Sequence, residues 1–164
     1  MSALIGRLKD FVRLDQADQQ RTSPSLLLAE TVDMLRPQIP ERIVVELDLG
    51  ELPQIQCYPR ELNQAFMTLI VNAVDAIEDT GRIVISSLIA GDEIRVRITD
   101  AGKGLQPERL SRIFEVGFVE RGATMRMNVG LAMCQSLVHR HAGSIEVQSA
   151  VGVGTTFELI LPIR

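Results

Sequence analysis

Two kinds of hydrophobic periodicity follow one another along this chain and predict a mixture of helices and strands. Between Glu61 and Ile77, apolar residues recur every three or four positions, which predicts an amphipathic helix with one buried face. Residues 94–98 instead carry apolar side chains at every second position, which predicts a strand with one solvated face. The same patterns predict further helices at residues 1–14, 24–35 and 130–141, and further strands at residues 43–49, 55–57, 83–88, 144–148 and 155–161.

Proline and glycine residues mark where these elements begin and end. Pro24 favours a helix start, while Pro37 and Pro40 end the same helix. Gly143 follows the last predicted helix and is placed to cap its C-terminus. Turns at residues 90–92 and 152–154 close two hairpins. Helices mixed with hairpins predict an α+β domain in which one layer of helices covers one sheet.

The N-terminal part of the chain has a different character. The apolar positions Leu4, Leu8 and Phe11 form a helical stripe that has no partner nearby in sequence. Residues 15–25 are polar and are predicted to form a linker. The helix that follows is predicted to bury Leu26, Leu27, Ala29, Val32 and Leu35.

Composition narrows the class of protein. A chain of 164 residues with 46% apolar residues can form one domain with a core that needs no disulfide or metal. The net charge of −4 argues against a general nucleic-acid binder. No apolar run is long enough to span a bilayer, and no signal peptide is evident. Cys57 and Cys134 are far apart in sequence, which favours free buried thiols in a reducing, cytoplasmic compartment.

The helix at residues 61–77 carries the first candidate site. Asn72 and Asp75 lie with Thr68 and Glu61 along one edge of the apolar stripe, where a cleft can open beside the core. The alternative is an ordinary amphipathic helix with a partly buried, hydrogen-bonded asparagine.

The second candidate site follows the strand at residues 94–99. Asp100 stands at the strand end, and Gly102 and Gly104 leave room for a flat ligand to approach its carboxylate. A carboxylate only accepts hydrogen bonds, which suits an exocyclic amino group such as adenine N6. The alternative is a simple hairpin turn with the same residues.

A less regular segment runs from residue 103 to residue 128 and contains more basic than acidic residues. Its charge indicates a modest preference for anions, but on charge alone a solvated loop is the favoured interpretation.

Five short motifs together resemble the successive motifs of the ATP-binding catalytic domain of bacterial sensor histidine kinases, a branch of the GHKL superfamily. They are Asn72-Ala73-Val74-Asp75-Ala76, Asp100-Ala101-Gly102-Lys103-Gly104, Ile113-Phe114-Glu115, Gly130-Leu131-Ala132 and Gly152-Val153-Gly154-Thr155-Thr156-Phe157. The resemblance covers residues 24–163. It implies a catalytic domain at residues 23–164, and residues 1–22 resemble the end of the helical dimerisation and phosphoacceptor domain.

The resemblance also implies a fold and a site. The fold would be the Bergerat two-layer α/β sandwich, in which helices cover one face of a mixed, mostly antiparallel sheet, with a flexible ATP lid. Asp100 would receive adenine N6, and Asn72 would hold Mg²⁺ on the phosphates. Arg121 would meet a phosphate, and the helix N-terminus at Gly130 would face the polyphosphate. The implied nucleotide-binding residues are Asn72, Asp75, Asp100, Gly102, Gly104, Arg121, Arg126, Asn128, Gly130, Leu131 and Thr155.

Two departures from the family pattern concern the metal site and the lid. Thr68 replaces a second asparagine that the family usually places one turn before Asn72. Arg126 and Asn128 stand where the lid normally has glycine, so the backbone approaches the phosphates less easily, although asparagine tolerates left-handed φ.

The resemblance implies a histidine kinase that uses ATP and Mg²⁺ and works in two-component signalling. Related ATPases and serine kinases use a glutamate at position 68 as general base, and Thr68 cannot accept a proton near neutral pH. Glu61 lies about two turns further back on the helix, too far away to be the obvious substitute as general base. His139 and His141 lie at the end of the last helix, so a structural role is expected and the phosphoacceptor histidine would lie outside this chain.

The implied partners are ATP, the phosphoacceptor helical domain of the same kinase and a downstream response regulator, in a homodimeric full-length protein. The domain would be cytoplasmic even if the full-length protein is membrane-anchored. The alternative is a pseudokinase or a regulatory nucleotide- or partner-binding module with a degenerate lid.

Overall fold

The computed structural model describes the backbone of residues 19–115, 117–121, 124–128 and 130–163, and the side chains of all of these except residues 117–128. Within this part of the chain, no helix is both long enough and apolar enough to cross a membrane. The elements are β1 (Gln20–Thr22), α2 (Pro24–Leu35), the short 3₁₀ helix η1 (Arg36–Gln38), β2 (Ile43–Leu49), β3 (Ile55–Cys57), α3 (Pro59–Ala76), β4 (Gly81–Ala90), β5 (Glu93–Asp100), α4 (Pro107–Leu110), β6 (Gly117–Arg121), β7 (Thr124–Asn128), α5 (Gly130–Arg140), β8 (Ser144–Ala150) and β9 (Gly154–Pro162).

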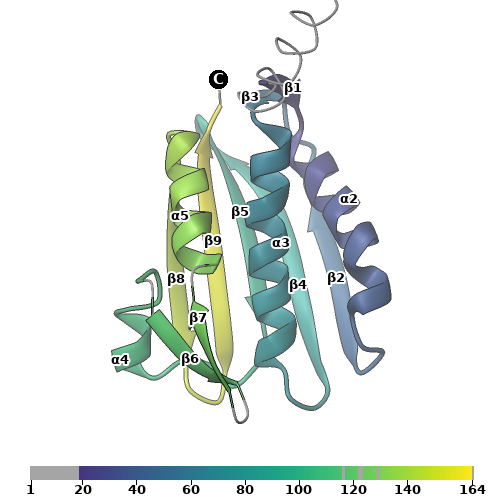
Figure 1. Ribbon diagram of the computed structural model, residues 1–164. Coiled ribbons are helices and arrows are strands. Elements are labelled where there is room, and N and C mark those ends of the chain that lie inside the picture. Colours follow the sequence, from purple (N-terminus) through teal and green to yellow (C-terminus); the bar gives the residue numbers. More distant parts are fainter. Residues whose placement is uncertain (1–18, 116, 122–123, 129, 164) are drawn as a thin grey trace, which may run out of the picture.

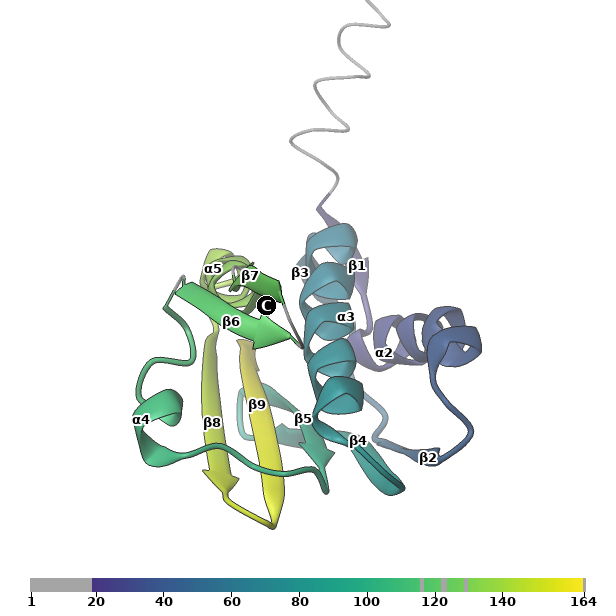
Figure 2. The same cartoon turned by 60° about the horizontal axis from the view of Figure 1, so that its bottom comes forward.

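A five-stranded sheet in the order β2-β4-β5-β9-β8 forms one layer of the domain. Strand β2 runs parallel to β4, and the remaining neighbours in this sheet are antiparallel. Helices α2, α3 and α5 form the second layer and lie on the same face of the sheet (Figures 1 and 2). The predicted two-layer α/β sandwich with a mixed, mostly antiparallel sheet is therefore confirmed.

Helix α3 occupies the centre of the helical layer and supplies much of the core. All seven apolar positions of its predicted stripe are buried, with 0–3% of their surface exposed. They are Leu62, Ala65, Phe66, Leu69, Ile70, Ala73 and Ile77. Burying a large apolar side chain stabilises a fold by about 1.5–3 kcal/mol. The periodicity of the sequence thus correctly predicted the buried face of α3.

Strand β5 also follows its predicted alternation. Ile94, Val96 and Ile98 are buried beneath the helices. On the other face of the sheet, the Arg95 and Arg97 guanidinium groups both bond to the carboxylate of Glu158 on the neighbouring strand β9. These ion pairs keep the uncovered face polar.

The predicted buried face of α2 needs two corrections. Ala29 is only partly buried. Leu26 is 54% exposed, whereas Leu28 is fully buried. Pro24 starts the helix as predicted, and Thr31 joins its buried face by donating its hydroxyl hydrogen to Leu27 O over 2.8 Å. In a run of three leucines, the phase of the helix depends on what it packs against, so local periodicity alone misassigned the first of them.

Two segments predicted to be irregular contain strands. Residues 20–22 of the predicted linker form β1, which pairs antiparallel with β3. The segment between residues 103 and 128 contains α4 and the β6–β7 hairpin. Both sets of strands are short, with three or five residues each, which is too short for a clear two-residue period. Residues 1–18 lie outside the described part of the chain.

The C-terminal end of α5 also differs from its prediction, because the left-handed residue is Ala142 (φ 58°) and not Gly143. The Ala142 N–H bonds to His139 O over 2.9 Å and the Gly143 N–H to Val138 O over 3.1 Å, which is a Schellman motif. Position 143 requires glycine for a steric reason instead, since a Cβ at this position would lie 2.3 Å from Ile160 O.

We predict that Ala142→Gly stabilises the domain by about 1 kcal/mol, because glycine avoids the left-handed strain of alanine. Gly143→Ala should destabilise it, since the added methyl group overlaps a backbone oxygen of β9. Urea unfolding would measure both changes. Ala29→Gly in the middle of α2 is the matched control and should cost about 0.5–1 kcal/mol. If Ala142→Gly destabilised the protein, this would contradict the left-handed conformation of Ala142 at the end of α5.

Candidate functional site

The C-terminal end of α3 anchors the segment that carries Asp100. The Lys103 N–H donates to Ala76 O over 3.2 Å. Gly102 passes so close to this helix end that a Cβ would lie 2.5 Å from Ala76 O. The motif at the end of β5 therefore lies directly against the motif on α3, and Gly102 is needed for the close approach.

Asp100 is the last residue of β5, and its side chain is only 4% exposed. Its Oδ1 accepts a hydrogen bond from the Gly102 N–H over 2.9 Å. Burial raises the pKa of this carboxyl above its usual value, while hydrogen bonds from the backbone of Gly102 and Thr155 oppose the shift. The strand-end position of Asp100 agrees with the prediction, and the structure adds that the carboxylate is buried and oriented.

The turn between β8 and β9 supports the other side of the Asp100 segment. Gly104 has a φ of +72°, and a Cβ on it would lie 2.1 Å from Ala150 O. The Gly152 N–H donates to Lys103 O over 2.9 Å. Thr155 is buried and pairs with Asp100 across β9 and β5. Two of the predicted motifs, at residues 100–104 and 152–157, thus form one packed unit.

Helix α5 begins beside the middle of α3. A Cβ on Gly130 would lie 3.3 Å from Thr68 Cγ2, so the two helices nearly touch at this point. Asn72 lies one helical turn after Thr68 and one turn before Ala76, a step of about 6 Å each way along the axis. Asn72 is half-buried and lies between the N-terminus of α5 and the Asp100 segment. Leu131 is buried and packs into the core.

The other polar residues on this edge of α3 have different environments. Asp75 is exposed at the C-terminal end of the helix. The Thr68 hydroxyl donates to Gln64 O of its own helix over 2.9 Å. Among the described residues, no group of three or more His, Cys, Asp or Glu side chains could hold a metal ion.

Glu61 lies at the opposite end of the α3–α5 interface. Its carboxylate pairs with Arg140 Nη1 over 3.2 Å, at the C-terminus of α5. Helix α5 runs from Gly130 to Arg140, which separates its two ends by about 15 Å. Glu61 is therefore remote from Asn72, in agreement with the prediction that it is not a general base of this site.

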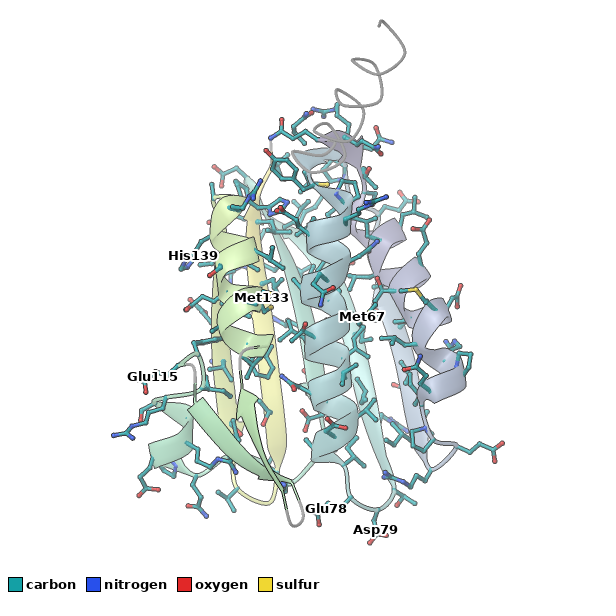
Figure 3. All side chains as sticks on the ribbon, in the orientation of Figure 1. Met67, Glu78, Asp79, Glu115, Met133 and His139 are labelled. Carbon is teal, nitrogen blue, oxygen red and sulfur yellow. The ribbon has the colours of Figure 1, made fainter. Side chains whose placement is uncertain are left out.

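The two histidines lie at the same remote end. The His141 Nε2 accepts the Tyr58 N–H over 3.0 Å, and its Nδ1 lies 2.8 Å from Leu137 O. This arrangement holds a neutral imidazole with its proton on Nδ1, so His141 has the structural role that was predicted. His139 is exposed and points outward from α5 (Figure 3).

The side chains of the predicted lid residues Arg121, Arg126 and Asn128 lie outside the described part of the chain. Their backbone belongs to the β6–β7 hairpin, in which Val119 pairs with Arg126 and Gly117 with Asn128. The hairpin precedes α5 in the chain, and Figure 1 shows it below α5 at the lower end of the domain.

Sequence reasoning missed two features near this site. One is Ser149 on β8, whose hydroxyl lies 2.8 Å from the Thr155 hydroxyl. The other is a hollow of about 390 Å³ at the same end of the sheet, lined in part by Arg82, Thr99 and Thr156. These three side chains alternate with the buried positions of their strands, so the hollow opens on the face without helices. Neither feature follows a motif in the sequence.

Both cysteines are buried and free, as predicted. Burial raises the pKa of the Cys134 thiol to about 12, so the thiol stays protonated and donates to Ala65 O over 3.7 Å. This contact is a further link between α5 and α3.

Comparison with known proteins agrees with this geometry. Residues 57–164 match the family described as histidine kinase-, DNA gyrase B- and HSP90-like ATPase. The sensor histidine kinase ZraS of Escherichia coli K12 is 36% identical over 113 residues, which are 69% of this chain. The match covers 24% of ZraS, so the chain spans about a quarter of the length of this relative.

Solved structures share the fold. The mycobacterial sensor histidine kinase MprB superposes with a TM-score of 0.77 at 22% identity, covering 90% of this chain and 99% of MprB. Full-length ShkA in complex with AMPPNP gives a TM-score of 0.77 at 26% identity, covering 98% of this chain and 35% of ShkA. The chain belongs to the histidine kinase-, DNA gyrase B- and HSP90-like ATPase family, as a catalytic domain of the sensor histidine kinase type.

Proposed function

We propose that this domain binds ATP with Mg²⁺ and donates the γ-phosphoryl group to a histidine on a separate helical domain. The observation that carries the proposal is the convergence of three motifs on α3. They lie along the C-terminal half of this helix. The N-terminus of α5 lies beside Thr68, the half-buried Asn72 follows one turn later, and the segment after the buried Asp100 contacts Ala76. Membership of the family and the nucleotide named in the ShkA complex support ATP as the ligand.

Asp100 would recognise the base. Its carboxylate accepts hydrogen bonds and cannot donate them while ionised, which matches the amino group of adenine. The Gly102 N–H donates to Oδ1, which orients the carboxylate and leaves further lone pairs for the base. The two glycines act through packing, because a side chain on Gly102 would overlap Ala76 O and crowd Asp100 Oδ1, and one on Gly104 would overlap Ala150 O. The sequence-based expectation that both leave room for the base is therefore replaced by a role in holding the Asp100 segment in place.

Asn72 would hold the metal and the phosphates. Mg²⁺ prefers oxygen ligands and is usually held by one or two protein groups together with phosphates and water, and a half-buried carboxamide oxygen fits this requirement. When bound, Mg²⁺ would neutralise charge on the phosphates. The first backbone N–H groups of an α-helix have no partner within the helix, so the N-terminus of α5 favours the polyphosphate. We assign phosphate contacts to Gly130, Leu131, Arg121, Arg126 and Asn128, with Asp75 at the edge of the site.

The absence of a glutamate one turn before Asn72, where Thr68 stands, favours transfer to a histidine over hydrolysis. The Thr68 hydroxyl is bonded to its own helix, and Glu61 is paired with Arg140. An imidazole nitrogen is already nucleophilic when neutral, so it needs no base to attack the γ-phosphorus. The N–P bond would form as the bond from phosphorus to the β,γ-bridging oxygen breaks, leaving ADP. Catalysis would rest on positioning and charge neutralisation.

From the same family membership we infer the domain boundaries, the oligomeric state, the downstream partner and the location of the full-length protein. Residues 1–22 would end the helical phosphoacceptor domain and residues 23–164 would form the catalytic domain. The full-length kinase would be a homodimer that passes its phosphoryl group to a response regulator, with this domain in the cytoplasm.

We predict that Asp100→Asn weakens binding of a non-hydrolysable ATP analogue by about 10- to 150-fold, since hydrogen bonds to charged groups contribute about 1.5–3 kcal/mol. Isothermal titration calorimetry would measure the change. Asp48→Asn, on the exposed part of β2, is the matched control and should bind normally. Binding that is insensitive to Asp100→Asn would contradict the proposed base contact.

The same variant should fold as stably as the wild type, or more stably, at neutral pH. Burial raises the Asp100 pKa above 3.8 in the folded state. The stability that this group contributes is therefore greatest below pH 3.8 and is lost as the pH rises through the raised value. Thermal unfolding at neutral pH checks this expectation and shows whether lost binding reflects lost folding.

Asn72→Ala should remove the Mg²⁺-dependent part of binding and leave binding in EDTA unchanged, because only the metal contact is deleted. Titrations of the ATP analogue with and without Mg²⁺ would test this. Gln64→Ala, on the exposed face of the same helix, is the control. An equal loss in both conditions would show that Asn72 contacts the nucleotide without a metal.

Phosphoryl transfer needs its own test, because binding alone is also expected of a pseudokinase. We expect radiolabel from [γ-³²P]ATP to appear on an added phosphoacceptor domain and to be acid-labile, as phosphohistidine is. A chain that binds ATP with Mg²⁺ and labels no acceptor would support the pseudokinase alternative and overturn the kinase proposal.

A further inference from the structure

The hydroxyl of Ser149 joins three parts of the chain at the rim of the proposed adenine site. It lies 2.8 Å from the Leu105 nitrogen, 3.1 Å from Gly154 O and 2.8 Å from the Thr155 hydroxyl. Leu105 directly follows the Asp100–Gly104 segment, while Gly154 and Thr155 begin β9. One side chain on β8 therefore links both backbone segments that surround Asp100.

The hydrogen count of this cluster determines which atom donates in each bond. A serine hydroxyl has one hydrogen and two lone pairs. The Leu105 N–H can only donate, so it uses one lone pair of Ser149. Gly154 O can only accept, so it takes the single hydrogen of Ser149. We assign the hydrogen of the Thr155 hydroxyl to the remaining lone pair of Ser149, because this is the assignment in which all three contacts are hydrogen bonds.

This assignment decides what the Thr155 hydroxyl, next to Asp100, can offer to a ligand. Because its hydrogen is committed to Ser149, the Thr155 hydroxyl offers only lone pairs to a ligand or a bridging water. Thr155 is 5% exposed and stands opposite Asp100 in the β5–β9 pairing, where facing side chains of antiparallel strands are neighbours. Asp100 is also an acceptor when ionised. This edge of the site thus presents two acceptors side by side.

We propose that Ser149 is a positioning residue that determines base specificity by holding Thr155 as a hydrogen-bond acceptor. Two adjacent acceptors favour a purine with an amino group at position 6 and disfavour a purine with an oxygen there, because the oxygen leaves buried acceptors unpaired. The inference rests on the proposed ATP binding and assigns a part of its selectivity to a residue that does not touch the base.

The test compares ADP with IDP, which has an oxygen in place of the 6-amino group, by calorimetry in the presence of Mg²⁺. We expect the wild-type protein to prefer ADP. Ser149→Ala should lower this preference by about 2- to 12-fold, the range expected for one neutral hydrogen bond, because the Thr155 hydroxyl becomes free to donate to the oxygen of IDP. Ser149→Thr keeps the hydroxyl and should restore the preference. Ser144→Ala, on the exposed start of the same strand, is the control.

A double variant separates positioning from a general structural effect. Ser149→Ala should change the ADP to IDP ratio in the wild-type background and leave it unchanged in a Thr155→Val background, since Ser149 acts through that hydroxyl. The ratio is measured on folded protein, so a loss of stability does not alter it. An equal effect in both backgrounds, an unchanged ratio in Ser149→Ala, or a wild type without preference would overturn the inference and leave ATP binding intact. Absence of any binding by the wild type would overturn the proposed function as well.

Discussion

The contact between the C-terminal end of α3 and the segment after β5 is the constraint on which the rest of the site depends. Ala76 O accepts the Lys103 N–H, and Gly102 lies too close to it for any side chain. This contact joins the helical layer to the end of the sheet at the point where Asp100 becomes accessible. Because Asp100 is the last residue of β5, its position is set by the sheet and its surroundings by the helix.

The register between α3 and α5 completes the arrangement. The two helices run antiparallel, with Arg140 bonded to Glu61, Cys134 to Ala65 and Gly130 against Thr68. The contact between Arg140 and Glu61 is purely structural, whereas the contact between Gly130 and Thr68 lies next to the candidate site. The α5 N-terminus is thereby held one helical turn from Asn72. A slip of α5 by one turn would move its N-terminus by about 5.4 Å.

The chemistry of the site follows from what these contacts leave available. Asp100 is buried and oriented, and burial raises its pKa, so the fold retains this charge against its own stability. Such a residue is expected where binding, and not folding, requires the charge. Glu61 and His141 are titratable too, but each is engaged in a contact at the remote end of the helices. This separation of the structural contacts from Asp100 supports the proposal that the site binds and positions a nucleotide, while another domain supplies the nucleophile.

The sequence alone determined the elements with strong periods and the residues of the two main motifs. The seven buried positions of α3, the alternation of β5 and the strand-end location of Asp100 were predicted correctly, because each depends on neighbours within a few residues. Features that depend on packing were not. Leu28 replaced Leu26 in the core, Ala142 and not Gly143 took the left-handed cap, and β1 formed within a predicted linker. Ser149 acquired its place beside Thr155 only when β8 paired with β9. Tertiary structure decided these points because helix phase, backbone clearance and strand pairing are settled by partners far away in sequence, which local patterns do not contain.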